Sequence, residues 1–362
     1  MLLKPLRPPL RALPCARIPG RAKVEPEDFV VEEVPAYSPK GTGTHLFLWI
    51  EKRGLSTPDA VRKIAQALGK NEREVGFAGL KDAQAISRQW LSVEHVDRAR
   101  AAALAWNDLR VLDTGLHDNK LRAGHLRGNR FTIVLRECGA EQLAQLQTNL
   151  DFLVANGALN WFGEQRFGKR GANLQKGLDV LLAADPRQAA RRVPHHLYNL
   201  ILSAVQSEAF NRVLARRLDT TGKLFDGDIA FLHASGAAFV VEDAAKEQPR
   251  CTQFAISPSG PLPGPRCLRP LGEQAQIEAK SLQELGITHE HFGTLPRDSP
   301  PGARRPLRIP VLAASAAVTT NGLQVAFELP AGSYATAVLR ELLDDAPWFG
   351  PATGPATGPT QD

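Results

Sequence analysis

The stretch "GFAGLKDAQAISRQWLSV" (Gly76–Val93) joins a glycine-rich loop to a strand-forming segment. In its middle stand Lys81 and Asp82. An aspartate after Gly-Leu-Lys is most often a turn or helix-capping residue. A neighbouring cation favours the ionised carboxylate, which is the form that a nucleophile needs. The stretch therefore admits two interpretations of Asp82, as a capping residue or as a catalytic carboxylate.

Working outward from this stretch, strand and helix patterns alternate without a regular strand–helix repeat. Alternating or β-rich segments predict strands at 45–52, 130–136 and 322–329, the last with Leu323, Val325, Phe327 and Leu329 on one face. Helical periodicity predicts helices at 58–68, 141–156 and 195–218. In the first helix, Thr57 is the expected N-cap and Gly69 the expected end. This arrangement predicts an α+β fold with several antiparallel strands.

Composition and spacing argue against several classes of protein. The 362 residues are enough for two domains, and no run approaches the ~20 apolar residues of a membrane helix. The segment Gly41–Gly43 lacks the third glycine of a dinucleotide fingerprint. Four widely spaced cysteines offer no zinc set and fit reduced thiols. We therefore predict a cytoplasmic protein without a metal or small-molecule cofactor and without a membrane segment.

Basic residues are concentrated in a few segments, although the net charge is only +6. Between His117 and Arg136 a single acid, Asp118, accompanies a cluster of five cations: Lys120, Arg122, Arg127, Arg130 and Arg136. The segment "NWFGEQRFGKRGANLQKG" (Asn160–Gly177) mixes glycines, aromatics and cations. Its aromatic rings could stack on bases beside Gln165 and Arg166, or could fill a core. The basic clusters favour a nucleic-acid partner.

Six stretches, taken together, resemble the TruD family of pseudouridine synthases, which act on uridine 13 of tRNA. They occur in the family's order and cover about Lys23 to Leu343: "KVEPEDFVVEEV", "FAGLKDAQAISRQWLSV", "RGNRFTIVLR", "NWFGEQRFGKRGANLQKG", "SAVQSEAFNRVLARRL" and "FELPAGSYATAVLREL". The resemblance implies the pseudouridine synthase α+β fold, with a mixed, mostly antiparallel sheet and a second α+β domain inserted into it.

The same resemblance implies the domain limits. Residues 1–156 and 304–350 would form the two parts of the catalytic domain, and 157–303 the insert. The proline-rich segment at Pro301–Pro310 independently predicts a boundary near there. Residues 351–362 are a low-complexity tail, expected to be disordered.

The resemblance also implies roles for single residues. Asp82 occupies the position of the family's catalytic aspartate, and Phe29, Asn129 and Phe327 match its substrate-contacting residues. Lys81, Gln165 and Arg166 are further predicted substrate contacts.

The implied reaction breaks the glycosidic bond of uridine, turns the base and rejoins it to ribose through carbon. Nothing is oxidised and no group is lost, so the expected enzyme is a monomeric tRNA isomerase that needs no cofactor. Attack of Asp82 on the ribose and attack on the uracil ring both remain open. The alternative function is a non-catalytic RNA-binding protein or tRNA chaperone on the same fold, which would need neither Asp82 nor Asn129.

Overall fold

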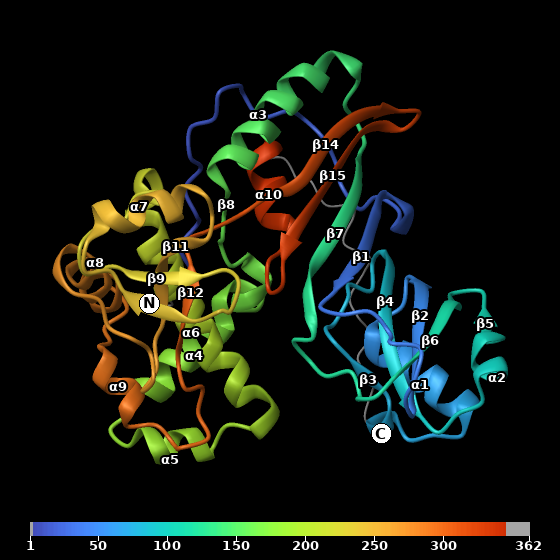
Figure 1. The fold of residues 1–362 in the computed structure, drawn as a ribbon. Coiled ribbons are helices and arrows are strands. Elements are labelled where there is room, and N and C mark those ends of the chain that lie inside the picture. Colours follow the sequence, from blue (N-terminus) through green and yellow to red (C-terminus); the bar gives the residue numbers. More distant parts are fainter. Residues whose placement is uncertain (1–2, 345–362) are drawn as a thin grey trace. The chain divides into compact units, whose positions relative to one another are not determined.

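The computed structural model describes residues 3–344, apart from the side chains of Gln165, His195 and His196, and divides into two compact units (Figure 1). The sheet unit comprises residues 13–155, 311–335 and 339–344, and the helical unit comprises 3–12, 156–310 and 336–338. The limits of the units thus fall near 155 and 310. The predicted domain limits of 156 and 303 remain predictions, and the predicted tail at 351–362 lies outside the described residues.

The sheet unit contains a nine-stranded sheet in which most neighbouring strands are antiparallel. Its order is β14-β15-β7-β1-β4-β2-β6-β5, with β3 also paired to β4, and only β1 and β4 run parallel. The strands are β1 (Phe29–Pro35), β2 (His45–Arg53), β3 (Gly76–Phe77), β4 (Ile86–Glu94), β5 (Ala105–Trp106), β6 (Leu109–His117), β7 (Leu126–Leu135), β14 (Leu312–Thr319) and β15 (Gly322–Pro330). The prediction of a mixed, mostly antiparallel sheet is confirmed. The sheet unit contains the helices α1 (Thr57–Leu68) and α2 (Arg98–Ala102) and most of α3 (Leu143–Asn156) and α10 (Ala335–Leu342). The last residue of α3 and residues 336–338 of α10 are assigned to the helical unit.

Helix α1 covers part of one face of this sheet through an apolar stripe. Val61, Ile64 and Leu68 pack in one buried cluster with Leu48 of β2 and Leu91 of β4. The prediction of Thr57 as the N-cap was wrong by one residue. Ser56 is the N-cap, its side chain accepts a hydrogen bond from the backbone N–H of Asp59, and Thr57 is the first residue of the helix. Gly69 ends the helix in the left-handed conformation, with φ of 69°, as predicted.

The opposite face of the sheet carries a row of alternating charges across six strands. Five ion pairs of 2.6–3.4 Å link its members in the order Glu328, Arg130, Glu32, Arg88, Glu51 and Arg110. Each pair joins directly opposite residues of neighbouring strands, so a register slip of one residue would break the row. Arg130 is therefore neutralised within the sheet.

The helical unit holds a four-stranded antiparallel sheet in the order β10-β9-β11-β12, a two-stranded ladder and, besides short 3-10 turns, six complete α-helices within the described residues. Its strands are β8 (Ala158–Leu159), β9 (Ile229–Leu232), β10 (Ala238–Val240), β11 (Ile256–Leu262), β12 (Ala303–Pro306) and β13 (Arg308–Ile309). Its helices are α4 (Ala172–Leu181), α5 (Pro186–Arg191), α6 (His195–Arg216), α7 (Ala244–Thr252), α8 (Gly272–Gln283) and α9 (His289–Gly293). Helix α6 lies in the core of the unit, where even the polar Ser207 and Asn211 are buried.

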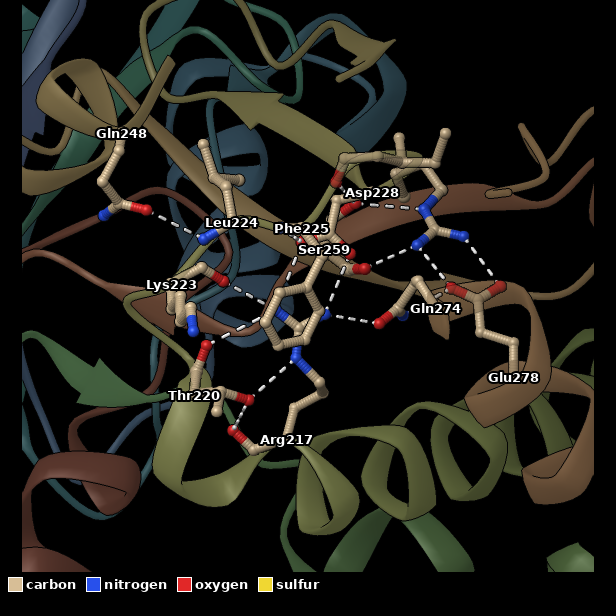
Figure 2. Close-up of polar contacts among 12 residues, drawn as sticks. Arg217, Thr220, Lys223, Leu224, Phe225, Asp228, Gln248, Ser259, Gln274 and Glu278 are labelled. Carbon is tan, nitrogen blue, oxygen red and sulfur yellow. Dashed lines mark hydrogen bonds and ion pairs between the residues drawn. The ribbon is translucent and has the colours of Figure 1, made fainter. Parts of the chain in front are cut away.

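A buried polar network ties these elements together (Figure 2). Arg217, just beyond α6, donates to Asp228 at 2.9 Å and to Gln274 of α8. Glu278, one turn further along α8, accepts from Gln274 and pairs with Arg304 of β12 at 2.7 Å. Two cations and two carboxylates balance one another, which is the condition under which charges are tolerated in a core.

Among residues 3–344, no helix combines the length and the apolar character that crossing a membrane requires.

Candidate active site around Asp82

Asp82 lies in the loop between β3 and β4, and buried side chains hold the backbone of this loop. The carbonyl oxygen of Asp82 accepts hydrogen bonds from Lys52 Nζ at 3.0 Å and from Ser87 Oγ at 3.3 Å. One residue earlier, the backbone N–H of Lys81 donates to Thr57 Oγ1 at 2.9 Å. Lys52 and Ser87 lie opposite each other on β2 and β4. The sheet therefore fixes where Asp82 lies.

The Asp82 carboxylate is held in its ionised form. Its Oδ2 forms an ion pair with Lys23 Nζ, and Oδ1 accepts the backbone N–H of Gln84 at 3.0 Å. Partial burial by itself raises the pKa of this carboxyl, but Lys23, the Gln84 amide and the charge of Lys52 together lower the pKa below its usual 3.8. The side chain remains 41% exposed, so the anion is accessible.

The ammonium of Lys81, the residue directly before Asp82, does not contact the Asp82 carboxylate. Lys81 Nζ forms a buried ion pair with Glu33 of β1 at 2.8 Å, so its ammonium points away from solvent. Lys23 and Lys52 supply the positive charge at Asp82 instead. Burial lowers the pKa of Lys52 to about 8, against the opposing effect of Asp82. The role of Lys81 as a substrate contact stays a prediction.

The other residues expected at the site belong to the same face of the sheet. Phe29 of β1, Asn129 of β7 and Phe327 of β15 all alternate in phase with the buried residues of their strands. Phe131 lies between the two phenylalanines, with ring centroids 6.0 Å from Phe29 and 5.6 Å from Phe327. Lys23 Nζ lies 4.1 Å from the centre of the Phe29 ring and so links this aromatic row to Asp82.

These three side chains differ in how they are satisfied. Phe29 and Phe327 are buried, with 3% and 0% of their surface exposed, and both pack in the hydrophobic core. Asn129 Oδ1 is also buried but has no hydrogen-bond partner among the described residues. Because an unsatisfied buried acceptor costs about 1–3 kcal/mol, it is a place where a ligand donor would be favourable.

The segment Asn160–Gly177 lies in the helical unit, and its aromatic rings do not form a stacking surface. Trp161, Phe162 and Phe167 are 3%, 5% and 2% exposed and belong to the core. The interpretation in which these rings fill a core is therefore confirmed, and the interpretation in which they stack on bases is wrong. Arg166 is half-buried and donates to Ser207 of α6 at 3.3 Å. The side chain of Gln165 lies outside the described residues.

Sequence reasoning missed two residues at Asp82. Lys23 opens the stretch "KVEPEDFVVEEV", and Lys52 is the last residue but one of strand β2, where a lysine would ordinarily face solvent. Only their spatial neighbours distinguish them from surface cations. Lys23 adopts a left-handed backbone, with φ of 57°, which is uncommon for a residue other than glycine. Within the described part of the chain, no group of three or more His, Cys, Asp or Glu side chains could hold a metal ion.

Comparisons with known proteins identify relatives over most of the chain. The family model described as tRNA pseudouridine synthase D (TruD) matches residues 11–182 and 172–342. The tRNA pseudouridine synthase D of Syntrophotalea carbinolica is 38% identical, over 90% of this chain and 96% of its own length. That of Anaeromyxobacter dehalogenans is 42% identical, over 89% and 92%. A crystal structure named for the same synthase, from Methanosarcina mazei, shares the fold with a TM-score of 0.76 at 24% identity, covering 92% of this chain and 96% of that one.

Proposed function

The chain belongs to the TruD family of tRNA pseudouridine synthases, and on this premise we propose that Asp82 is the nucleophile with which it isomerises uridine in tRNA. The activity is that of a tRNA pseudouridine synthase, an isomerase. The prediction of this activity from the six stretches is confirmed, and nothing among the relatives favours a non-catalytic tRNA-binding protein.

The observation that carries the assignment of Asp82 is its accessible, ionised carboxylate on a loop that the sheet holds in place. The reaction breaks the bond between C1′ of the ribose and N1 of uracil, and forms a bond between C1′ and C5. The proton on C5 leaves, and N1 gains one, so atoms and electrons balance. A carboxylate can form a covalent adduct with either fragment and hold it while the base turns.

The neighbouring residues support this chemistry. Lys23 keeps the Asp82 carboxylate charged and orients it through their ion pair. The unsatisfied Oδ1 of Asn129 would accept a hydrogen bond from the extruded uridine or its ribose. Following the family, Phe29 and Phe327 would contact the extruded base; both rings are buried against Phe131 in this structure, so that contact requires the chain that covers them to move. Lys81 acts through Glu33, by fixing the loop before Asp82.

The finer assignments follow the family: uridine 13 of tRNA as the target, a monomer in the cytoplasm, and no cofactor, because the isomerisation needs neither an oxidant nor a co-substrate. Gln165 and Arg166 would contact the RNA from the helical unit.

The test compares the chain with its Asp82→Asn variant on an unmodified tRNA transcript. Asparagine keeps the shape of the side chain but removes its charge and nucleophilicity. We expect pseudouridine at position 13 with the original chain and none with the variant, while both bind tRNA. Comparable rates from the two proteins would refute the role of Asp82, and binding without any modification by the original chain would support the non-catalytic alternative.

A further inference from the structure

A cationic pocket lies in the sheet unit, outside the residues assigned to the reaction. Its volume is about 590 Å³, within the range of small-ligand sites. The walls come from the segment after β1, from the first residue of β2 and from the segment that joins β6 to β7. The residues that matter for its chemistry are Tyr37, Lys40, His117, Lys120, Arg122 and His125.

One wall of this pocket is preorganised. Tyr37 donates to or accepts from His125 Nδ1 at 2.6 Å, and its ring stacks on His117 with centroids 4.9 Å apart. His117 is itself buried and contacts Phe47 of the sheet, with centroids 5.0 Å apart. The pocket therefore keeps its shape without a ligand, which lowers the entropic cost of binding one.

Two of the three Lys and Arg side chains of the pocket, Lys120 and Arg122, have no acidic partner among the described residues. Arg122 is exposed, and its guanidinium makes no hydrogen bond or ion pair with any residue that the structure describes. Among residues 3–344, Lys120 Nζ donates only to the backbone carbonyl oxygen of Arg73, which carries no charge. Lys40, by contrast, pairs with Asp118 at 2.9 Å. Two positive charges of the pocket thus remain available to an anion.

Comparison with the rest of the basic cluster sharpens this point. Of its five cations, Arg130 is paired with Glu328 and Glu32, and Arg136 with Glu25 and Asp28. Arg130 of β7 and Arg136, the residue that follows the strand, are thus paired within the fold. Lys120 and Arg122, which precede the strand, face the pocket instead.

The pocket is built onto the start of the loop that carries Asp82. The backbone N–H of Gly124 donates to the carbonyl oxygen of Ala78 at 2.8 Å, and Leu121 packs with Ala78 and Phe47 in a small buried cluster. A Cβ atom on Gly76 would lie 2.2 Å from the carbonyl oxygen of Leu121, so only glycine permits this approach. Four residue steps separate Ala78 from Asp82, a reach of at most about 14 Å.

We propose that this pocket binds a backbone phosphate of the RNA strand that carries the target uridine, with Lys120 and Arg122 as its ligands. Its nearness to Asp82 places the bound phosphate on a flank of the extruded nucleotide, where it would fix the position of the strand. The identification of the anion as RNA rests on the proposed function. Arginine and lysine are the usual partners of phosphate, because their N–H groups match its oxygens in charge and geometry.

The experiment measures binding of an unmodified tRNA transcript as a function of salt. The variant Lys120→Gln/Arg122→Gln removes the two available charges. The matched control, Arg62→Gln/Arg100→Gln, removes two exposed charges from α1 and α2 of the same unit, neither of which lines the pocket. Each lost phosphate contact reduces the slope of log K against log salt by about 0.7–0.9. Because the pocket holds one phosphate, we expect the slope of the pocket variant to fall by about 0.7–0.9 and that of the control to match the original chain.

Equal slopes for the original chain and the pocket variant would overturn the inference. Arg122→Gln alone provides a second variant, because its exposed side chain has no described partner whose loss could disturb folding. Its slope should fall in the same direction, by no more than about 0.7–0.9, because Lys120 still contacts the phosphate. A parallel assay of pseudouridine separates the two proposals. If the original chain forms pseudouridine but the pocket variant keeps the same slope, the phosphate site is refuted and the proposed function stands. A reduced slope with no product from the original chain removes the function and leaves an RNA phosphate site.

Discussion

Lys81 Nζ lies 2.8 Å from a carboxylate oxygen of Glu33, and both side chains are buried. The cation adjacent to Asp82 in the sequence therefore serves an ion pair inside the fold, whereas Lys23, 59 positions away, pairs with Asp82 itself. Lys81 thus stabilises the loop, whereas Lys23 acts on its carboxylate. Lys52, which donates to the carbonyl oxygen of Asp82, is the third lysine near the loop, and each of the three leads to a different prediction.

Lys81→Met should destabilise the protein by about 3–5 kcal/mol, because it leaves Glu33 charged or protonated in a core without its partner. Burial already raises the pKa of Glu33 against the opposing effect of Lys81. The double variant Lys81→Met/Glu33→Leu should recover most of the loss. Urea unfolding of the four members of this cycle measures the coupling energy; a coupling near zero would contradict the pairing.

Lys23→Met should lower kcat by roughly 10- to 100-fold, because the reacting carboxylate loses its orienting partner. It should also move the acid limb of the pH–rate profile to higher pH. The sign follows from the contributions to the pKa of Asp82: Lys23 lowers it, and burial, which raises it, remains after the substitution. Lys23→Arg, which keeps the charge, should retain the acid limb. A profile for Lys23→Met that keeps the original limb would show that Lys23 does not act on Asp82.

Lys52 should make stability rise with pH above 8. Its folded pKa of about 8 is below the unfolded value near 10.5, so the unfolded chain binds more protons in this window. The stabilisation gained by pH 10.5 would be on the order of 3 kcal/mol. The measurement is the free energy of unfolding of the original chain minus that of Lys52→Met, between pH 7 and 10. A flat difference would mean that the buried amine titrates normally.

Glu278→Gln should destabilise the helical unit by about 3–5 kcal/mol, because Arg304 keeps a buried charge without its carboxylate. Hydrogen exchange should show faster exchange in α8 and β12. An exposed substitution on the same helix, Glu273→Gln, is the control and should change stability by less than about 0.5 kcal/mol. Similar exchange in the two variants would argue against a stabilising role for the network in Figure 2.

Sequence periodicity predicted the elements that bury a regular face. The alternation of Leu323, Val325, Phe327 and Leu329 appears as the buried face of β15, and the predicted helix at 58–68 appears as α1. The N-cap is Ser56 rather than the predicted Thr57, because serine and threonine can both cap a helix and the backbone geometry decides between them. Composition could not predict whether Trp161, Phe162 and Phe167 are buried or exposed, because a glycine-rich aromatic segment does not indicate which way its rings point.

The sequence alone determined the fold class, the family and the identity of the candidate nucleophile, because periodicity and ordered motifs are properties of the chain itself. Only the tertiary structure decided which cation meets which anion. Arg130 and Lys120 belong to one basic cluster, yet the sheet neutralises the first and leaves the second at a pocket. The physical reason is that the strength of an ion pair depends on the separation and burial of its charges, and both are set by strand register and loop path rather than by distance along the chain.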